Sequence, residues 1–201
     1  MNHQFHEVPF EKRIELIEHL QRFVAVEETE KDQILSSVSF KIVKKKEYLL
    51  TEGQLCTCIY FVIRGCLRVY LITESGLEQI TQFAIENWWV TDYDSFENQS
   101  PSQFFIQATE DSEIIVIDKN SLEELFNLVP KVERYFRIIL QKNLIAAQRR
   151  LLWINTISSE QRYRNFVESF PAFVQRVPQY MLASYLGITP EFLSKIRAKK
   201  Q

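Results

Sequence analysis

The sequence predicts an α+β protein in which a domain of short antiparallel strands precedes a helical region. Three observations predict this order. Between residues 40 and 118, short apolar segments recur about every ten residues with turn residues between them, which is typical of a β-sandwich or barrel. Residues 131–157 contain no helix breaker, so they predict one helix about 40 Å long. Residues 179–197 form two short amphipathic segments around a glycine, which predicts a helix-turn-helix.

The composition is that of a soluble globular protein. Of the 201 residues, 46% are hydrophobic and 25% are charged, and the net charge is −2. No apolar stretch approaches the roughly 18 residues that a membrane-spanning helix needs, and the first residues lack the apolar core of a secretory signal. We therefore expect a cytoplasmic protein with no membrane partner. Three cysteines, an odd number, argue against a disulfide framework.

The first domain is expected to span residues 1–130. Two amphipathic helices, 10–23 and 28–38, precede the strands, and Ile14 and Leu20 lie on the apolar side of the first helix. A change to short apolar segments then marks the strands. These are expected at 40–44, 47–50, 58–63, 67–73, 78–84, 104–109 and 113–118, followed by a short helix at 121–127.

The long helix, residues 131–158, is expected to form a homodimer. One set of apolar residues has the 4-3 spacing of a coiled-coil seam: Leu140, Leu144, Ala147, Leu151 and Ile154. A second stripe can pack on the strands of the same chain: Val132, Tyr135, Phe136 and Ile139. The alternative is a helix buried on two sides of one chain. A helix this long and apolar in a small protein more often pairs with a second copy, so we favour the dimer.

The C-terminal domain, residues 159–201, carries the helix-turn-helix. Gly187 can adopt the positive φ that ends a first helix. Thr189 is a good N-cap for a second helix, and Pro190 suits its first position because the missing amide would have no partner there. Apolar residues in register supply a core: Leu182, Leu186, Ile188, Leu193 and Ile196. Phe192 is a further apolar residue of the second helix. The second helix of this motif reads DNA, whereas a purely structural αα-hairpin is the alternative.

Charge is unevenly distributed along the chain. Residues 176–201 contain five Lys or Arg and one Glu, a net charge of +4, although the whole chain carries −2. A basic end on an acidic body is expected when one end of a protein meets phosphate. Arg176, Gln179 and Lys199 are expected to anchor DNA phosphates.

The order of these parts resembles the Crp/Fnr transcription regulators of bacteria, the relatives of the cyclic-AMP receptor protein. The most specific segments are EGQLCTCIYFVIRGCLRVYLITESGLEQITQF (52–83) and VPQYMLASYLGITPEFLSKIR (177–197). The resemblance covers nearly the whole chain and is to the form with a minimal C-terminal helix-turn-helix. It implies a cupin-like antiparallel β-roll of the cyclic-nucleotide-binding type, a long helix at the dimer interface, and a homodimer on double-stranded DNA. RNA polymerase is then a further candidate partner.

The resemblance also assigns the residues that read bases, which fall on Pro190, Glu191 and Lys195. Glu191 can accept a hydrogen bond from cytosine N4, and Lys195 can donate to guanine. Pro190 stands where many members have an arginine, so the target sequence is expected to differ. Further phosphate or base contacts are expected from Thr189, Ser194 and Arg197.

The nucleotide site of the family is degenerate in this sequence. The matching segment contains Trp89, Thr91, Asp92, Ser102 and Gln103. Asp92 could replace the glutamate that holds the ribose, but Ser102 stands where an arginine should neutralise the cyclic phosphate, and Asp94 would repel it. We therefore expect neither cyclic AMP nor another cofactor, and any other effector remains unidentified.

Other sensing chemistry finds little support in the sequence. An iron–sulfur cluster needs four cysteines, and this chain has Cys56, Cys58 and Cys66, which are expected inside strands as buried thiols, with a redox switch as the alternative. His3 and His6 are expected to be a solvated pair. Three aromatic residues are expected in the core, with an apolar pocket as the alternative: Trp88, Trp89 and Tyr93.

Two other functions are weaker alternatives. A cupin-like enzyme would need histidines within the strands to hold a metal ion, and no histidine follows His19. We therefore expect a protein that is not an enzyme. A ligand-binding roll that acts through protein partners is the other alternative, and it would not show salt-dependent binding to duplex DNA.

Overall fold

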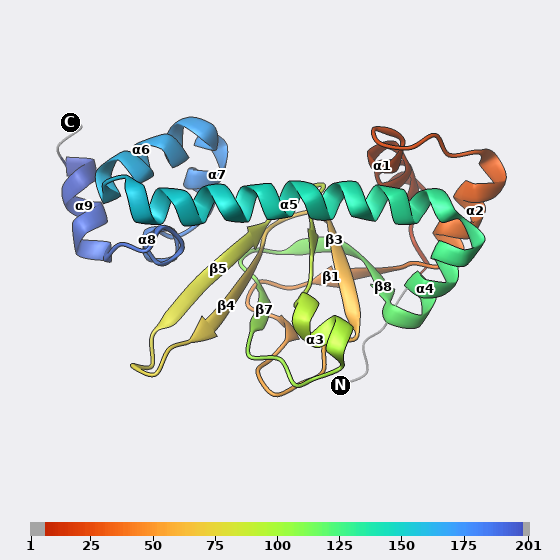
Figure 1. Ribbon diagram of the computed structural model, residues 1–201, viewed down its shortest axis with the longest axis horizontal. Helices are drawn as coiled ribbons and strands as arrows, with labels where there is room; N and C mark the ends of the chain where they lie inside the picture. Colours follow the sequence, from red (N-terminus) through yellow and green to blue (C-terminus); the bar gives the residue numbers. More distant parts are fainter. Residues whose placement is uncertain (1–6, 199–201) are drawn as a thin grey trace.

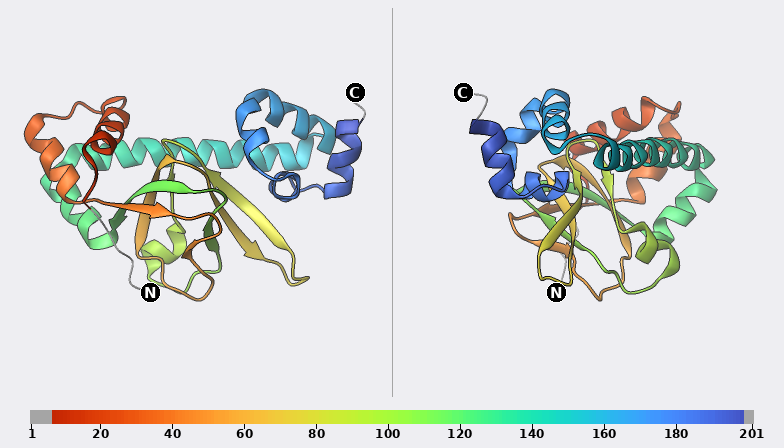
Figure 2. Two further views of the ribbon diagram at one scale, coloured as in Figure 1. Left: turned by 180° about the vertical axis from the view of Figure 1, so that it is seen from behind. Right: turned by 60° about the vertical axis from the view of Figure 1, so that its left-hand side comes forward.

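The long helix α5 (Pro130–Thr156) crosses the whole molecule above a central β-roll (Figure 1). The computed structural model describes residues 7–198, so the predicted pair His3 and His6 lies outside the described residues. The N-terminal helices and α4 lie at one end of α5, and the C-terminal helices lie at the other end. The views in Figure 2 show the same arrangement from behind and from the side.

The roll consists of two four-stranded antiparallel sheets, which confirms the predicted α+β class. The sheets have the strand orders β1-β8-β3-β6 and β2-β7-β4-β5. Phe61 lies opposite Ile115 in the first sheet, and Val69 lies opposite Ile106 in the second, all four side chains being buried. The strands are β1 (Ser39–Val43), β2 (Tyr48–Leu50), β3 (Cys58–Arg64), β4 (Leu67–Ile72), β5 (Glu78–Ala84), β6 (Trp89–Val90), β7 (Phe105–Ala108) and β8 (Ser112–Asp118).

The predicted strands and helices are confirmed to within a few residues, but three short elements were missed. Strand β6 has two residues, and helices α3 and α7 have six each, which is too short for a periodic pattern. Pro171 begins α7, where the missing amide costs nothing. The helices are α1 (Phe10–Gln21), α2 (Glu28–Ser36), α3 (Tyr93–Asn98), α4 (Lys119–Leu128), α5, α6 (Ser159–Ser169), α7 (Pro171–Arg176), α8 (Gln179–Leu186) and α9 (Pro190–Ala198).

Two hydrophobic cores hold these elements together. The larger core joins the roll, the N-terminal helices and the first half of α5, and it contains the inner stripe predicted for that helix, Val132, Tyr135, Phe136 and Ile139. The smaller core joins α6 to α9 with Cys66, Tyr70, Ile80 and Phe83 of the roll. The C-terminal helices therefore share one hydrophobic core with the second sheet.

The cysteines correct one prediction. Only Cys58 lies in a strand, at the start of β3, whereas Cys56 precedes that strand and Cys66 lies in the turn between β3 and β4. Cys56 and Cys66 are buried and all three thiols are free. Burial raises the pKa of Cys66 to about 12, so at neutral pH this sulfur is a thiol.

Helix α1 is rotated relative to the prediction, since Ile14 is 44% exposed and His19 is buried. His19 Nδ1 lies 2.8 Å from the hydroxyl of Tyr135, and that hydroxyl accepts a hydrogen bond from Trp89 Nε1 at 2.6 Å. The direction of the His19–Tyr135 hydrogen bond depends on the histidine tautomer, because the hydroxyl can either donate its own proton or accept a second hydrogen bond. Burial, with Arg22 and Lys142 nearby, lowers the pKa of His19 from 6.5 to about 4.

We expect this histidine to make stability depend on pH. Between about pH 6.5 and 4 the unfolded chain binds a proton that the folded chain does not, so the free energy of unfolding falls as the pH falls through this window. In His19→Gln, whose amide can donate to or accept from Tyr135 but does not titrate, this fall in the free energy of unfolding should be smaller. Urea unfolding at pH 7, 6, 5 and 4 measures it, and equal pH dependence of parent and variant would contradict the assignment.

Candidate nucleic-acid interface

Helices α8 and α9 form the predicted helix-turn-helix. Gly187 ends α8 in the left-handed conformation with φ of +65°, and its N–H donates to the carbonyl of Ser184. The N–H of Ile188 donates to Ala183, so both bonds satisfy carbonyls at the end of α8. A residue with a Cβ would adopt this conformation only with strain, which explains why glycine stands at the turn.

The start of α9 is also built as predicted. The Thr189 hydroxyl accepts a hydrogen bond from the N–H of Phe192 at 3.2 Å, which is N-capping, and Pro190 is the first helical residue. The pKa of Glu191 is lowered because its carboxylate accepts hydrogen bonds from its own N–H and from Thr189, and because Lys195 lies nearby. Glu191 is therefore a carboxylate at neutral pH.

The predicted core of the motif is confirmed. Leu182, Leu186, Leu193 and Ile196 are buried, Ala183 is fully buried, and Ile188 is partly buried. The small side chain of Ala183 lets the two helices cross closely. Phe192, which the sequence pattern placed with the apolar residues of α9, is instead 43% exposed.

The candidate DNA contacts lie together at one end of the molecule, where α9 is the outermost helix (Figure 1). Lys199 lies outside the described residues. The other candidates are all exposed: Gln179, Thr189, Pro190, Glu191, Ser194, Lys195 and Arg197. Because Leu193 and Ile196 face the core, Glu191 and Lys195 lie on the opposite side of the helix and point to solvent. The structure therefore presents a polar helix face that a groove could receive.

Arg176 corrects the prediction that it anchors phosphate. Its guanidinium forms a two-pronged ion pair with Glu86, with both N–O distances at 2.9 Å, and it also contacts Glu110 at 2.5 Å. One nitrogen donates further to the carbonyl of Gly65 at 3.0 Å. Two carboxylates of the roll thus bind this cation, and Arg176 fixes the C-terminal domain to the roll.

Helix α8 is also fixed to the roll, along the edge strand β5. The Ser184 hydroxyl accepts from the N–H of Ile80 at 2.9 Å and donates to the carbonyl of Glu78 at 2.8 Å. Arg150 on α5 donates to the backbone carbonyl of Tyr185 at the end of α8, at 2.8 Å, and to two backbone carbonyls of β5. These bonds satisfy backbone groups that an edge strand would leave exposed, and they set the position of the helix-turn-helix.

Three of the residues predicted for a degenerate ligand pocket bind one another or the backbone. Ser102 donates from its hydroxyl to Asp92 Oδ2 at 2.6 Å, and Asp92 Oδ1 accepts from the N–H groups of Asp94 and Ser95 at the start of α3. Thr91 donates to the carbonyl of Cys58 at 2.9 Å. Asp92, Ser102 and Thr91 are buried, so these polar groups are used within the roll.

The other two predicted pocket residues lie apart from this cluster. Trp89 is 4% exposed and packs between Phe61 and Phe136, with ring centroids 5.0 Å from each, so it belongs to the core. Gln103 is exposed. The core expectation therefore holds for Trp89, and Tyr93 is partly buried. Trp88 is 43% exposed and fits the pocket alternative.

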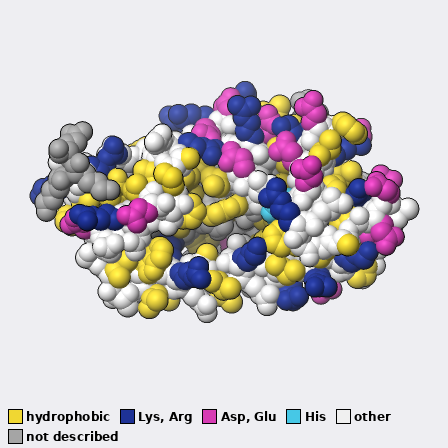
Figure 3. All heavy atoms as spheres, turned by 90° about the horizontal axis from the view of Figure 1, so that it is seen from above, with side chains coloured by type: hydrophobic (Ala, Val, Ile, Leu, Met, Phe, Trp, Pro, Cys, Tyr) yellow, Lys and Arg dark blue, Asp and Glu magenta, His cyan; other side chains and the backbone are white. Residues whose placement is uncertain are grey.

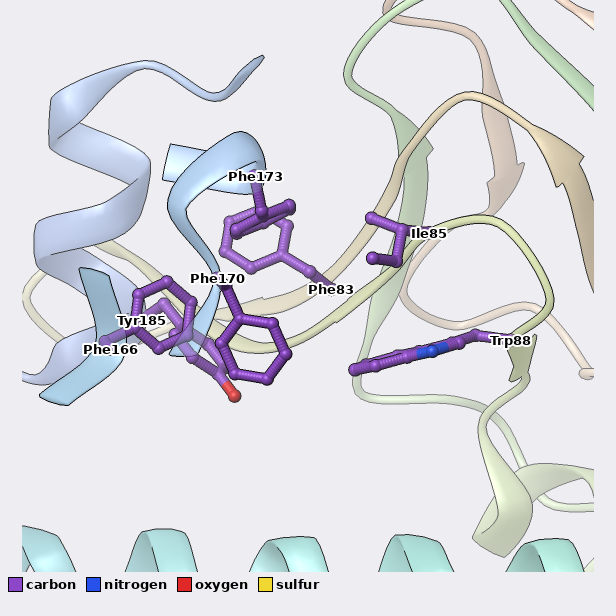
Figure 4. A pocket seen from close by; sticks show the side chains of 7 residues that line it. All are labelled: Phe83, Ile85, Trp88, Phe166, Phe170, Phe173 and Tyr185. Atoms are coloured by element: carbon purple, nitrogen blue, oxygen red, sulfur yellow. The ribbon is translucent and has the colours of Figure 1, made fainter. Parts of the chain in front are cut away.

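An aromatic pocket that includes Trp88 lies between the roll and the C-terminal domain, and the sequence did not predict its other lining residues. Seen from above, hydrophobic side chains gather around a hollow on this face (Figure 3). Figure 4 shows Trp88 and Phe170 on opposite sides of the opening. The pocket encloses about 40 Å³ and is lined by Phe83, Ile85, Trp88, Phe166, Phe170, Phe173 and Tyr185. The helical spacing of Phe166, Phe170 and Phe173 was the available signal, and it was missed.

The predicted seam of α5 faces solvent in the single chain. Leu140, Leu144, Leu151 and Ile154 are 42%, 59%, 64% and 40% exposed, and Ala147 is also exposed. The inner stripe of the same helix is at most 9% exposed. The two stripes thus have different surroundings, and the outer one is a continuous apolar face along the second half of the helix.

Two other kinds of site are absent from the described part of the chain. Within residues 7–198, no group of three or more His, Cys, Asp and Glu side chains is arranged to hold a metal ion. Over the same residues, no helix combines the length and the apolar character needed to cross a bilayer.

Known proteins resemble this chain in sequence and in fold. Residues 40–128 match the cyclic nucleotide-binding domain family. Electron transport regulator A of Shewanella oneidensis is 27% identical over 172 residues, which cover 80% of this chain and 68% of that protein. Regulatory protein HlyX of Actinobacillus pleuropneumoniae is 27% identical over 172 residues, covering 80% of this chain and 71% of HlyX.

Two solved structures have the same fold at lower identity. FixK2 from Bradyrhizobium japonicum has a TM-score of 0.70 and 18% identity, over 81% of this chain and 83% of that one. The c-di-GMP responsive global regulator CLP of Xanthomonas campestris has a TM-score of 0.71 and 16% identity, over 87% and 92%. Because these matches cover more than four fifths of the chain, the likeness extends beyond the roll.

Proposed function

Because this chain belongs to the Crp/Fnr family of transcription regulators, we propose that it binds a specific DNA sequence as a homodimer and so regulates transcription. The observation that carries the proposal is the helix-turn-helix at the end of the molecule. Its apolar side is buried, and the opposite side of α9 presents polar side chains to solvent. A buried inner face and a free polar outer face are what the second helix of this motif needs in a major groove.

The dimer would form through the exposed seam of α5. Apolar residues at a 4-3 spacing on a 27-residue helix favour a paired helix, since each leucine left in water forgoes about 1.5–3 kcal/mol of burial. A two-fold axis then relates two α9 helices, which would enter successive major grooves about 34 Å apart on a palindromic site. RNA polymerase is a candidate partner of the DNA-bound dimer.

Base recognition is assigned to Glu191 and Lys195. The carboxylate of Glu191 can accept from cytosine N4, and the ammonium of Lys195 can donate to guanine. Pro190 offers no donor, so this position contributes shape and no base contact through a side-chain hydrogen bond. Phosphate contacts are assigned to Gln179, Thr189, Ser194, Arg197 and Lys199.

We propose that the roll does not use cyclic AMP as its effector. The carboxylate of Asp92 is held by Ser102 and by the start of α3, so it is not free to bind a ribose. The buried Arg68 is not free either, because Glu78 and Gln107 accept its hydrogen bonds. A phosphate bound here would meet the charge of Asp92 without a cation to offset it.

The alternatives follow from the same observations. The relatives are regulators, and the proposed role is that of a cytoplasmic protein without enzymatic activity. A roll that acts only through protein partners would leave the polar face of α9 without a function. Affinity for duplex DNA that falls steeply with salt separates the two hypotheses.

Selection of bound sequences from random duplex DNA tests the proposal. We expect a palindromic site with half-sites one helical turn apart, and the same site with and without cyclic AMP. On that site Lys195→Ala should weaken binding by about 1–3 kcal/mol and relax specificity at one base pair in each half. The matched control is Lys45→Ala, which removes an exposed lysine from the turn between β1 and β2.

Three outcomes would count against the proposal. A selected pool without sequence preference would contradict the regulator function. Equal loss of affinity in both lysine variants would contradict the role of Lys195 in base reading. A site that appears only with cyclic AMP would contradict the account of the roll.

A further inference from the structure

Helix α9 leaves one large apolar side chain in water. Phe192 is 43% exposed, whereas Leu193 and Ile196 on the same helix are 0% and 4% exposed. Phe192 is the third residue of the helix, and its N–H donates to the capping hydroxyl of Thr189. It therefore lies in the first turn, the part of a recognition helix that contacts base edges.

The first turn offers two kinds of chemistry to a base pair. Pro190 has no donor, and Leu193 is occupied in the core. Glu191 presents a carboxylate, and Phe192 presents a phenyl ring beside it. In the major groove the one apolar mark is the C5-methyl group of thymine, and apolar side chains such as Phe contact it.

We infer that Phe192 is a specificity-determining residue that contacts a thymine methyl group in each half-site. This inference rests on the proposed function, since it requires α9 to enter the major groove. The two residues are consecutive in the first turn of the helix, so the thymine should lie near the base pair that Glu191 reads. Burial of one methyl group is worth about fourfold in affinity, or about fifteenfold for the two half-sites together.

The test must isolate the methyl group, because single apolar side chains also occur on surfaces that bind nothing. The operator selected by the parent protein is synthesised with each thymine replaced in turn by deoxyuridine, which lacks only that methyl group. Affinities are measured by fluorescence anisotropy. We expect one position in each half-site at which deoxyuridine weakens binding about fourfold, and about fifteenfold when both are replaced.

The variant Phe192→Ala links the effect to this residue. It should bind the thymine operator about fifteenfold more weakly than the parent, and it should lose no further affinity with deoxyuridine at the two sensitive positions. The matched control Leu128→Ala truncates a side chain that is 59% exposed at the end of α4, and it should remain as sensitive as the parent. The deoxyuridine scan on the parent needs no variant. It therefore tests whether the protein contacts a thymine methyl group even if Phe192→Ala does not fold.

Two results would overturn the inference. One is an operator that the parent binds equally well with every thymine replaced. The other is full deoxyuridine sensitivity in Phe192→Ala. If the parent selects no operator at all, the proposed function itself fails, and that result is distinct from a bound operator that is indifferent to its methyl groups.

Discussion

Replacing Leu144 and Leu151 together by glutamate is expected to convert the dimer to a monomer and to weaken operator binding at least about a hundredfold. These leucines are 59% and 64% exposed in the single chain and lie in the middle of the seam. Four leucines per dimer would lose their burial, each worth at most about 1.5–3 kcal/mol, and four carboxylates would face one another. A monomer holds one half-site only, and the linkage of two half-sites contributes roughly 10²–10⁴ in affinity.

Sedimentation equilibrium measures the oligomeric state, and titration of the selected operator measures the affinity. The control is Leu77→Glu, which places the same charge on a side chain that is 68% exposed in the turn between β4 and β5. We expect this variant to remain dimeric and to bind DNA like the parent. A double variant that still sediments as a dimer would show that the chains associate through another surface.

Local patterns in the sequence predicted the parts of the fold that depend on local chemistry. The turn at Gly187 and the cap at Thr189 each rest on one residue whose backbone preference suits its place, and both are confirmed. The inner stripe of α5 was also predicted correctly, because a helix displays its buried face in the spacing of its apolar residues. The outer stripe has the same kind of pattern, and its role in dimerisation stays a prediction.

Contacts between distant segments could not be read from the sequence. Arg176 has the charge of a phosphate anchor, but its partners Glu86 and Glu110 lie 90 and 66 residues earlier in the chain. The sequence gives no sign that Ser184 has a partner, because its hydroxyl accepts from the N–H of Ile80, a residue of the distant strand β5. The periodicity of α9 grouped Phe192 with Leu193 and Ile196, although a helix this short can bury only part of an apolar stripe.

The roll shows the same limit in the candidate ligand site. The sequence predicted that Asp92 and Ser102 stand in place of ligand-binding residues, at a degenerate pocket. In the structure these two side chains bind each other at 2.6 Å, and Asp92 caps α3, a helix too short to predict. Residue type was therefore enough to predict that a ligand contact is missing. It was not enough to predict the hydrogen bond between Ser102 and Asp92.

Replacing Gly65 by alanine is expected to lower the free energy of unfolding by about 3–5 kcal/mol and the melting temperature by roughly 6–20 °C. Gly65 has a φ of +106° and lies in the turn between β3 and β4. A Cβ there would lie 2.3 Å from Ser112 Oγ and 2.8 Å from Ser112 Cα. Ser112 is held by its pairing with Val43 in the neighbouring strand, so its backbone cannot easily move away.

The matched control is Gly76→Ala, because Gly76 has a φ of +77° and no atom lies within 4 Å of its added Cβ. This control carries the backbone strain without the collision, so we expect it to cost about 1–3 kcal/mol. Thermal and urea unfolding of the two variants measure the difference. Equal losses would mean that the turn yields to the new methyl group. The carbonyl of Gly65 accepts a hydrogen bond from Arg176, and its N–H donates to Glu86. A shift of this turn in Gly65→Ala would therefore also disturb the contacts that fix the C-terminal domain to the roll.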